Sequence, residues 1–127
     1  AFQTGMAMGV DIWAAEIIQM LKLEFPEVRL ICYLPCETQA DRWSGDWREK
    51  YFNALARADD VICLQEHYTT GCIQRRNRIM IDGSSRLIAV HDNISADGTA
   101  QAIHYAKKQG LDIVIISPLN GLPTSVN

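Results

Sequence analysis

The sequence lacks any apolar run that approaches the roughly 20 residues needed to cross a bilayer as a helix. It also lacks an excess of basic residues, since 12 Lys and Arg stand against 15 Asp and Glu and give a formal net charge of −3. Proteins dedicated to duplex DNA usually carry a strong basic excess. We therefore expect a protein that does not enter a membrane and for which nucleic acid is the less favoured partner.

A disulfide framework is also missing. The chain has 4 cysteines, which lie in or beside apolar runs, and we expect them to be buried, reduced thiols of a cytoplasmic protein. The first residues show no charged region or apolar core of a signal peptide. Because the sequence starts without Met and leads almost at once into a glycine loop, we expect that its first elements have been removed.

Short apolar runs alternate with amphipathic patterns along the chain. The runs, several of them rich in β-branched residues, predict strands at residues 29–34, 61–64, 86–90 and 112–116. Apolar spacings of three and four predict helices at residues 10–25, 46–58, 71–82 and 99–109. This alternation predicts an α/β, Rossmann-like three-layer domain with a mostly parallel sheet over residues 1–119, followed by a loose tail at 120–127.

Two glycine-bearing loops follow predicted strand ends or precede helices, where open α/β sheets bind ligands. They are residues 4–9 (TGMAMG) and residues 91–99 (HDNISADGT). Glycine lets backbone N–H groups approach an anion, and the helix N-terminus adds partial positive charge. Both loops therefore suit a phosphate, although neither has a dinucleotide or P-loop fingerprint and each is equally typical of a plain strand-to-helix turn. Asp11 either favours the helix dipole or accepts a ribose hydroxyl, a role that Glu37 also fits.

A basic cluster begins the third predicted helix. Arg75 and Arg78 are three residues apart and share a helical face, while Asn77 lies off it. The cluster is either a solvated face or a clamp for a phosphate or carboxylate. The spacing of Cys63, His67 and Cys72 matches no standard zinc site, so we expect no metal and no resident cofactor.

Four segments together resemble the YpsA-like proteins of the SLOG superfamily, whose relatives include the LOG-type phosphoribohydrolases and the DNA-processing protein DprA. They are TGMAMGVDIWAAE, the region of Pro35 and Arg42-Trp43, YTTGCIQRRNRIMID, and SRLIAVHD with GTAQAIHYAKKQG. YpsA-like proteins usually begin with an additional strand, which bears a Thr-Gly-His-type loop, and a long helix, and the sequence shows neither.

The resemblance implies a Rossmann-like domain that binds a nucleotide-derived ligand at its strand ends. It matches Gly5 and Gly9, with Met6 between them, to the first glycine loop of the family. It matches Arg75, Asn77 and Arg78 to the basic helix start, and Gly98 and Thr99 to the second phosphate loop.

Hydrolysis ranks below binding. LOG-type enzymes carry a glutamate where this sequence has Gln101, and an amide neither transfers the proton nor stabilises an oxocarbenium ion by charge. Glu66 or Asp97 are the substitutes that the sequence offers. We therefore expect a binding or sensing module for a phosphorylated, nucleotide-derived small molecule. The alternatives are a nucleoside monophosphate phosphoribohydrolase and a DprA-like binder of single strands, and we also expect self-association through an unpaired sheet edge.

Overall fold

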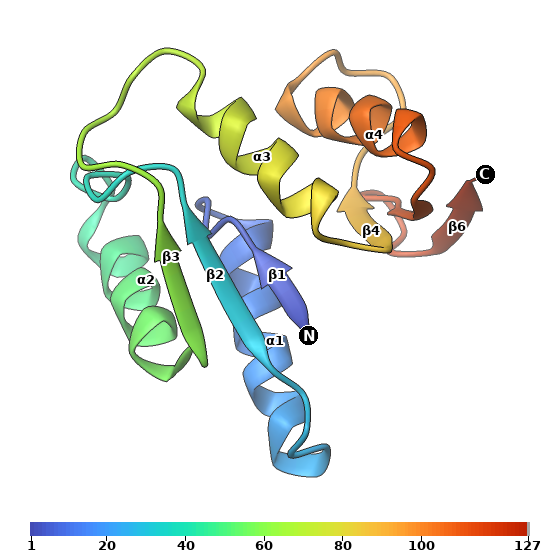
Figure 1. The fold of residues 1–127 in the computed structure, drawn as a ribbon. Coiled ribbons are helices and arrows are strands. Elements are labelled where there is room, and N and C mark those ends of the chain that lie inside the picture. The colour runs from blue at the N-terminus through green and yellow to red at the C-terminus, as the bar shows by residue number, and fades with distance from the viewer. Residues whose placement is uncertain (127) are drawn as a thin grey trace. The chain divides into compact units, whose positions relative to one another are not determined.

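The computed structural model describes residues 1–126, and in this part of the chain four helices alternate with the strands (Figure 1). The predicted α/β, Rossmann-like fold class is confirmed. The chain forms two compact units, one from Ala1 to Arg76 and one that begins at Asn77. Each unit contains a three-stranded sheet and a hydrophobic core of its own.

The first unit has a fully parallel sheet. Its elements are β1 (Phe2–Thr4), α1 (Val10–Glu24), β2 (Leu30–Leu34), α2 (Gly45–Arg57) and β3 (Asp60–Cys63), and the strand order is β1-β2-β3. Both crossovers step across the sheet in the same direction, and right-handed crossovers then place α1 and α2 on one face. The two helices contact each other, since the ring centroids of Trp13 and Trp47 are 5.9 Å apart.

The core of the first unit lies between these helices and one side of β2. Alternate residues of β2 are buried, which is the two-residue period of a strand, and Ile12, Ala15 and Ile18 bury one side of α1. Apolar burial of this kind supplies the main driving force for folding. It also fixes the register of β2, because a shift of one residue exchanges its buried and half-buried side chains.

The second unit begins within a helix. Its elements are the later part of α3 (Cys72–Asp82), then β4 (Arg86–Val90), α4 (Gly98–Lys108), β5 (Asp112–Ile116) and β6 (Pro123–Val126). β4 and β5 are parallel, and β6 joins β5 in the antiparallel direction. Its core consists of small and β-branched residues from all of these elements except β6, which contributes a half-buried Val126.

Two strands differ from the sequence-based expectations. β1 was not predicted before the first glycine loop, because a segment of three residues is too short to show a period. The tail was expected to be loose, yet its residues Pro123–Val126 form β6. The chain reverses at Gly121, where φ is +69° and glycine is favoured, and Pro123 takes the first position of an edge strand, where its missing N–H costs least. The other predicted elements differ from the observed ones by at most one residue at either end.

Three of the four cysteines are buried, as expected, but Cys63 is exposed. Cys63 lies in β3, an edge strand that pairs only with β2 in the first sheet. Only one of the two edges of β3 is therefore covered by a neighbouring strand. All four thiols are free. Within residues 1–126, no helix combines the length and the apolar character that a membrane crossing requires.

Candidate functional site

Three loops leave the carboxyl edge of the first sheet, because its three strands run parallel. They are residues 5–9 after β1, residues 35–44 after β2 and residues 64–71 after β3. Main-chain hydrogen bonds join the second loop to the third, since the N–H of Glu37 donates to the carbonyl oxygens of Gln65 and Glu66 at 3.0 and 3.1 Å. This is the edge at which open α/β sheets bind their ligands.

Gln39 joins the second loop to the first. Its Nε2 donates to the carbonyl oxygens of Gly5 and Met6 at 3.4 and 3.3 Å. Its Oε1 accepts from Nη1 of Arg76 at 3.3 Å. The amide therefore uses both of its ends, and it holds the glycine loop against the segment after β2.

Arg76 lies directly against the first glycine loop. Its side chain is buried, with 3% of the residue surface exposed, and its Nη1 donates to the carbonyl oxygen of Gly5 at 2.5 Å. A Cβ atom on residue 5 would lie 2.5 Å from Cζ of Arg76, which no side chain at that position can tolerate without a shift. Gly5 is therefore required for the close approach of a guanidinium, in addition to any role toward a ligand.

Hydrogen bonds made by the side chains of Thr4 and Asp11 hold the loop that leads into α1. Ala7 donates its N–H to Oδ2 of Asp11 at 3.1 Å, and the hydroxyl of Thr4 donates to the carbonyl oxygen of Asp11 at 3.2 Å. Met6 has a positive φ of 58° and is fully buried, and Gly9 has a φ of +94° at the N-cap position. The loop is thus a tightly organised turn into α1.

Burial dominates the electrostatics of this turn. Desolvation raises the pKa of Asp11, while the N–H of Ala7 and the charge of Arg76 oppose that rise. Desolvation also lowers the pKa of Arg76, and Asp11 is the first of the groups that oppose this change. The loop that was expected to accept a phosphate therefore already holds a carboxylate at its helix N-terminus, opposite a buried cation.

A cavity of about 520 Å³ opens on the same edge of the first unit. Its polar and aromatic lining comes from Thr38, Gln39, Asp41, Arg42, Trp43 and Tyr68. Trp43 packs edge to face on Tyr51, with ring centroids 5.1 Å apart, so part of its ring belongs to the core. Tyr68 is 62% exposed, so most of its ring faces solvent. The cavity size is within the usual range of small-molecule sites.

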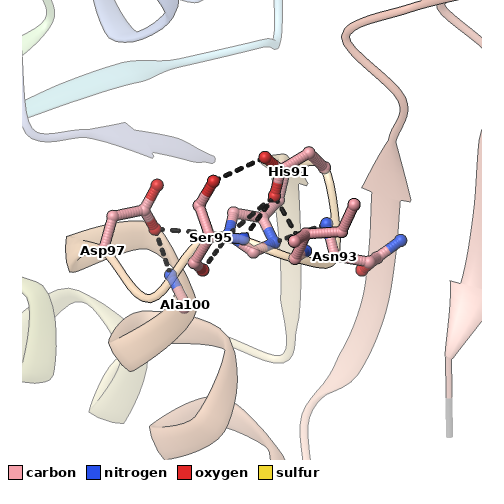
Figure 2. A network of polar contacts seen from close by, with 7 residues as sticks. His91, Asn93, Ser95, Asp97 and Ala100 are labelled. Carbon is pink, nitrogen blue, oxygen red and sulfur yellow. Dashed lines mark hydrogen bonds and ion pairs between the residues drawn. The ribbon is translucent and has the colours of Figure 1, made fainter.

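The second predicted loop, after β4, is organised around His91 (Figure 2). The ring Nδ1 accepts from the N–H of Asn93 at 3.0 Å, which leaves Nε2 as the donor to the carbonyl oxygen of Ser95 at 3.0 Å. The side chain of Asp92 accepts from the N–H groups of Ile94 and Ser95 and from the hydroxyl of Ser95. These bonds, led by the Ser95 hydroxyl, hold the pKa of Asp92 well below its ordinary range.

Asp97 caps α4, the helix whose N-terminus was expected to bind the second phosphate. Its Oδ1 accepts from the N–H of Ala100 at 2.9 Å and lies 3.3 Å from Nε2 of His91 (Figure 2). Gly98 and Thr99 form the first turn of the helix, and a Cβ atom at Gly98 would meet nothing within 4 Å. Both predicted phosphate loops thus contain a carboxylate that already accepts a main-chain N–H group.

The basic cluster divides along the helix. Arg75 and Arg78 are exposed and Asn77 is half-buried, whereas Arg76 is buried. Cζ of Arg78 lies 5.5 Å from the ring centroid of Tyr105, a residue of α4. Gly5, Met6, Gly9, Asp11, Glu37 and Arg75 belong to the first unit, while Asn77, Arg78, Gly98 and Thr99 belong to the second. Their convergence on one ligand stays a prediction.

The two candidate acids have different surroundings. Glu66 is exposed, and its Oε1 lies 3.6 Å from Nε2 of His67, itself exposed. Asp97 is committed to its helix cap. Both carboxylates are exposed to solvent rather than enclosed by apolar side chains. Among the described residues, no group of three or more His, Cys, Asp or Glu side chains is placed to hold a metal ion.

Neither Arg76 nor Gln39 was predicted to contact a small-molecule ligand. A signal for Arg76 was present, because Cys72 and Arg76 are four residues apart and Ile79 and Met80 follow at three and four more. That spacing places the arginine on the inner face of α3 rather than on its solvated face. Gln39 had no comparable signal, since its role depends on a loop without a period.

Comparison with known proteins agrees with this architecture. A family model named YpsA, described as the YspA SLOG family, matches residues 1–120. UPF0398 proteins from Bacillus cereus, Bacillus thuringiensis and Bacillus anthracis are each 30% identical to the chain over 105 residues, which is 81% of this chain and 57% of the relative. The chain therefore spans little more than half the length of these relatives. On the match over residues 1–120, the chain belongs to the YpsA family of SLOG proteins.

Proposed function

We propose that the first unit is a binding or sensing module for a nucleotide-derived small molecule, which it holds in the cavity at the carboxyl edge of its sheet. One observation carries the proposal: the cavity of about 520 Å³ combines Trp43 and Tyr68 with Arg42 and Asp41 in a single lining. An aromatic pair suits a base, a guanidinium suits a phosphate and a carboxylate suits a ribose hydroxyl. A nucleotide presents all three groups.

The electrostatics of the edge support an anionic guest. Arg76 is buried beside the first glycine loop, and its charge is opposed there by Asp11. Arg42 is exposed and lines the cavity, so it is the cation that a phosphate would meet. The phosphate is expected at Arg42 rather than at the N–H of Ala7, because Asp11 already occupies that donor.

The test is a thermal-shift panel of the whole chain with nucleoside mono- and diphosphates, ADP-ribose and dinucleotides. A ligand at 100 times its Kd adds about 2.7 kcal/mol to the free energy of unfolding, and the midpoint rises accordingly. Tyr68→Ala and Arg42→Ala should each remove most of that gain. Arg48→Ala is the matched control, because Arg48 is exposed on α2 near Phe52 and does not line the cavity.

Two results would count against this proposal. No stabilisation by any member of the panel at millimolar concentration removes the nucleotide class. Stabilisation that is unchanged in Tyr68→Ala and Arg42→Ala places the ligand elsewhere. Release of free base or ribose phosphate in the same mixtures would instead favour hydrolysis, and salt-sensitive binding of oligonucleotides would favour a single-strand binder.

A further inference from the structure

Helix α1 is apolar on two opposite sides. One side carries the buried Ile12, Ala15 and Ile18, which pack into the core. The opposite side exposes Trp13, Ile17 and Met20, at 51%, 57% and 69% of their surfaces. A helix that packs on one sheet normally turns charged and polar residues outward, and a helix that is apolar all round is normally covered. Trp13 contacts Trp47 of α2, but Ile17 and Met20 are more than half exposed, so most of the outer side of α1 is uncovered in the part of the chain that the structure describes.

A groove runs beside this outer side, between α1 and α2. It has a volume of about 560 Å³, and its apolar lining is Met20 and Leu23, of which Leu23 is 87% exposed. Lys50 and Arg57 line it from α2. Lys22 also lines it but is paired with Asp59, so its charge is already opposed. Glu16 lines it from α1, so Lys50 and Arg57 together with Glu16 leave one net positive charge in the groove. The groove therefore suits an occupant with apolar side chains and a carboxylate.

Helix α1 itself has that composition. Its exposed stripe of Trp13, Ile17 and Met20 follows the spacing of four and three that one helix presents to another. Glu24 is on the same helix and is exposed. A second copy of α1 would therefore bring apolar side chains to Met20 and Leu23 and a carboxylate to Lys50 and Arg57.

We propose that two copies of this chain associate through the outer side of α1, each copy laying α1 against the groove between α1 and α2 of the other. The arrangement is isologous: one two-fold axis satisfies both grooves at once and closes the assembly as a dimer. Exposed apolar patches of this kind are typical of interaction surfaces. The proposal does not depend on the identity of the ligand, because none of the groove residues lines the cavity at the carboxyl edge.

The experiment is light scattering of the whole chain after size-exclusion chromatography over a concentration series. The chain should have twice its monomer mass of 14.3 kDa and should dissociate on dilution. The double variant Ile17→Glu/Met20→Glu should be monomeric throughout, because it puts two carboxylates into the apolar contact. Ile94→Glu is the matched control: Ile94 is 89% exposed in the other unit, and the variant should remain dimeric. Circular dichroism of each variant would check that it is folded.

A second variant, Arg57→Glu, tests the contribution of charge to the dimer contact. It replaces attraction to the partner's carboxylate by repulsion and should raise the dissociation constant of the dimer about tenfold, or 1.4 kcal/mol. A monomer of 14.3 kDa at every concentration would overturn the proposal. So would a dimer that survives Ile17→Glu/Met20→Glu, which would indicate another surface, such as the unpaired edges of the strands. If the double variant is too unstable to measure, the single variant Leu23→Glu carries the same expectation.

Discussion

The guanidinium of Arg76 lies on the peptide of Gly5, with Nη1 2.5 Å from the carbonyl oxygen, although 71 residues separate the two in sequence. Arg76 thereby ties the start of α3 to the first glycine loop within the first unit. The contact explains two features with one cause: the loop needs a glycine at position 5, and one member of the basic cluster is buried.

Gly5→Ala should destabilise the protein by about 1–3 kcal/mol, the usual cost of overpacking a closed site. The added Cβ atom would meet Cζ, Nη1 and Nε of Arg76 at 2.5 to 2.7 Å. Urea denaturation measures the effect. Gly45→Ala is the control: a Cβ atom there meets nothing within 4 Å, so we expect little change. An equal loss in both variants would show that the contact with Arg76 is not the cause.

Arg76→Ala should cost about 2–3 kcal/mol, because it leaves the carbonyl oxygen of Gly5 and Oε1 of Gln39 without this donor in a buried place. Arg75→Ala, on the exposed side of the same helix, should stay within about 0.5 kcal/mol of the native protein. The two sites should also couple, since Gly5→Ala is expected to be nearly neutral when Arg76 is already alanine. Additive losses in that double-mutant cycle would contradict the assigned clash.

Asp11 should make the protein more stable as the pH falls toward the ordinary pKa of an aspartate. Burial raises the pKa of Asp11 in the folded state, so over the range just above the ordinary value the folded chain binds more protons than the unfolded chain. Stability from this group is therefore lost as the pH rises through the folded pKa. Asp11→Asn, which keeps an oxygen for the N–H of Ala7, should flatten this dependence and raise the midpoint at neutral pH.

Denaturation midpoints of the native chain and of Asp11→Asn across mildly acidic to neutral pH measure this prediction. Glu27→Gln is the control, because Glu27 is exposed after the end of α1. A midpoint for Asp11→Asn that is lower than the native one at neutral pH would mean that attraction to Arg76 outweighs the cost of burial.

Asp97 should stabilise α4 as its N-cap, and its charge should also weaken the binding of an anion at the N-terminus of that helix. Asp97→Ala removes the acceptor for the N–H of Ala100 and should cost about 1 kcal/mol. Asp97→Asn keeps an acceptor oxygen while it removes the charge, so its stability should change less. If the helix N-terminus can hold an anion, Asp97→Asn should bind inorganic phosphate more tightly than the native chain, as calorimetry would show. Equal phosphate binding by both would exclude the carboxylate as the obstacle.

The sequence was enough to place the candidate site at the carboxyl ends of the strands, but it did not predict the hydrogen bonds within the loops there. The rule that ligands bind beyond the carboxyl ends of parallel strands, together with the glycines, selected the loops at residues 4–9 and 91–99. It did not indicate that Asp11 and Asp97 would each accept an N–H group in the loops expected to bind phosphate. Side-chain hydrogen bonds of this kind depend on the loop conformation, which has no period to read.

By itself the sequence determined the α/β alternation, because strands and helices require different periodicities of apolar residues. The positions of β2 and α1 could therefore be predicted from the spacing of their apolar residues. The spacing along α3 indicates that Arg76, and not Arg75, lies on the inner face of the helix. Only the tertiary structure decided that this arginine would bond to Gly5, since that choice depends on which long-range surfaces meet. It likewise decided that β6 would pair with β5, where a turn at Gly121 supplies the reversal and the sheet supplies the partner. Local patterns encode which face of an element is apolar, and only packing decides what that face will touch.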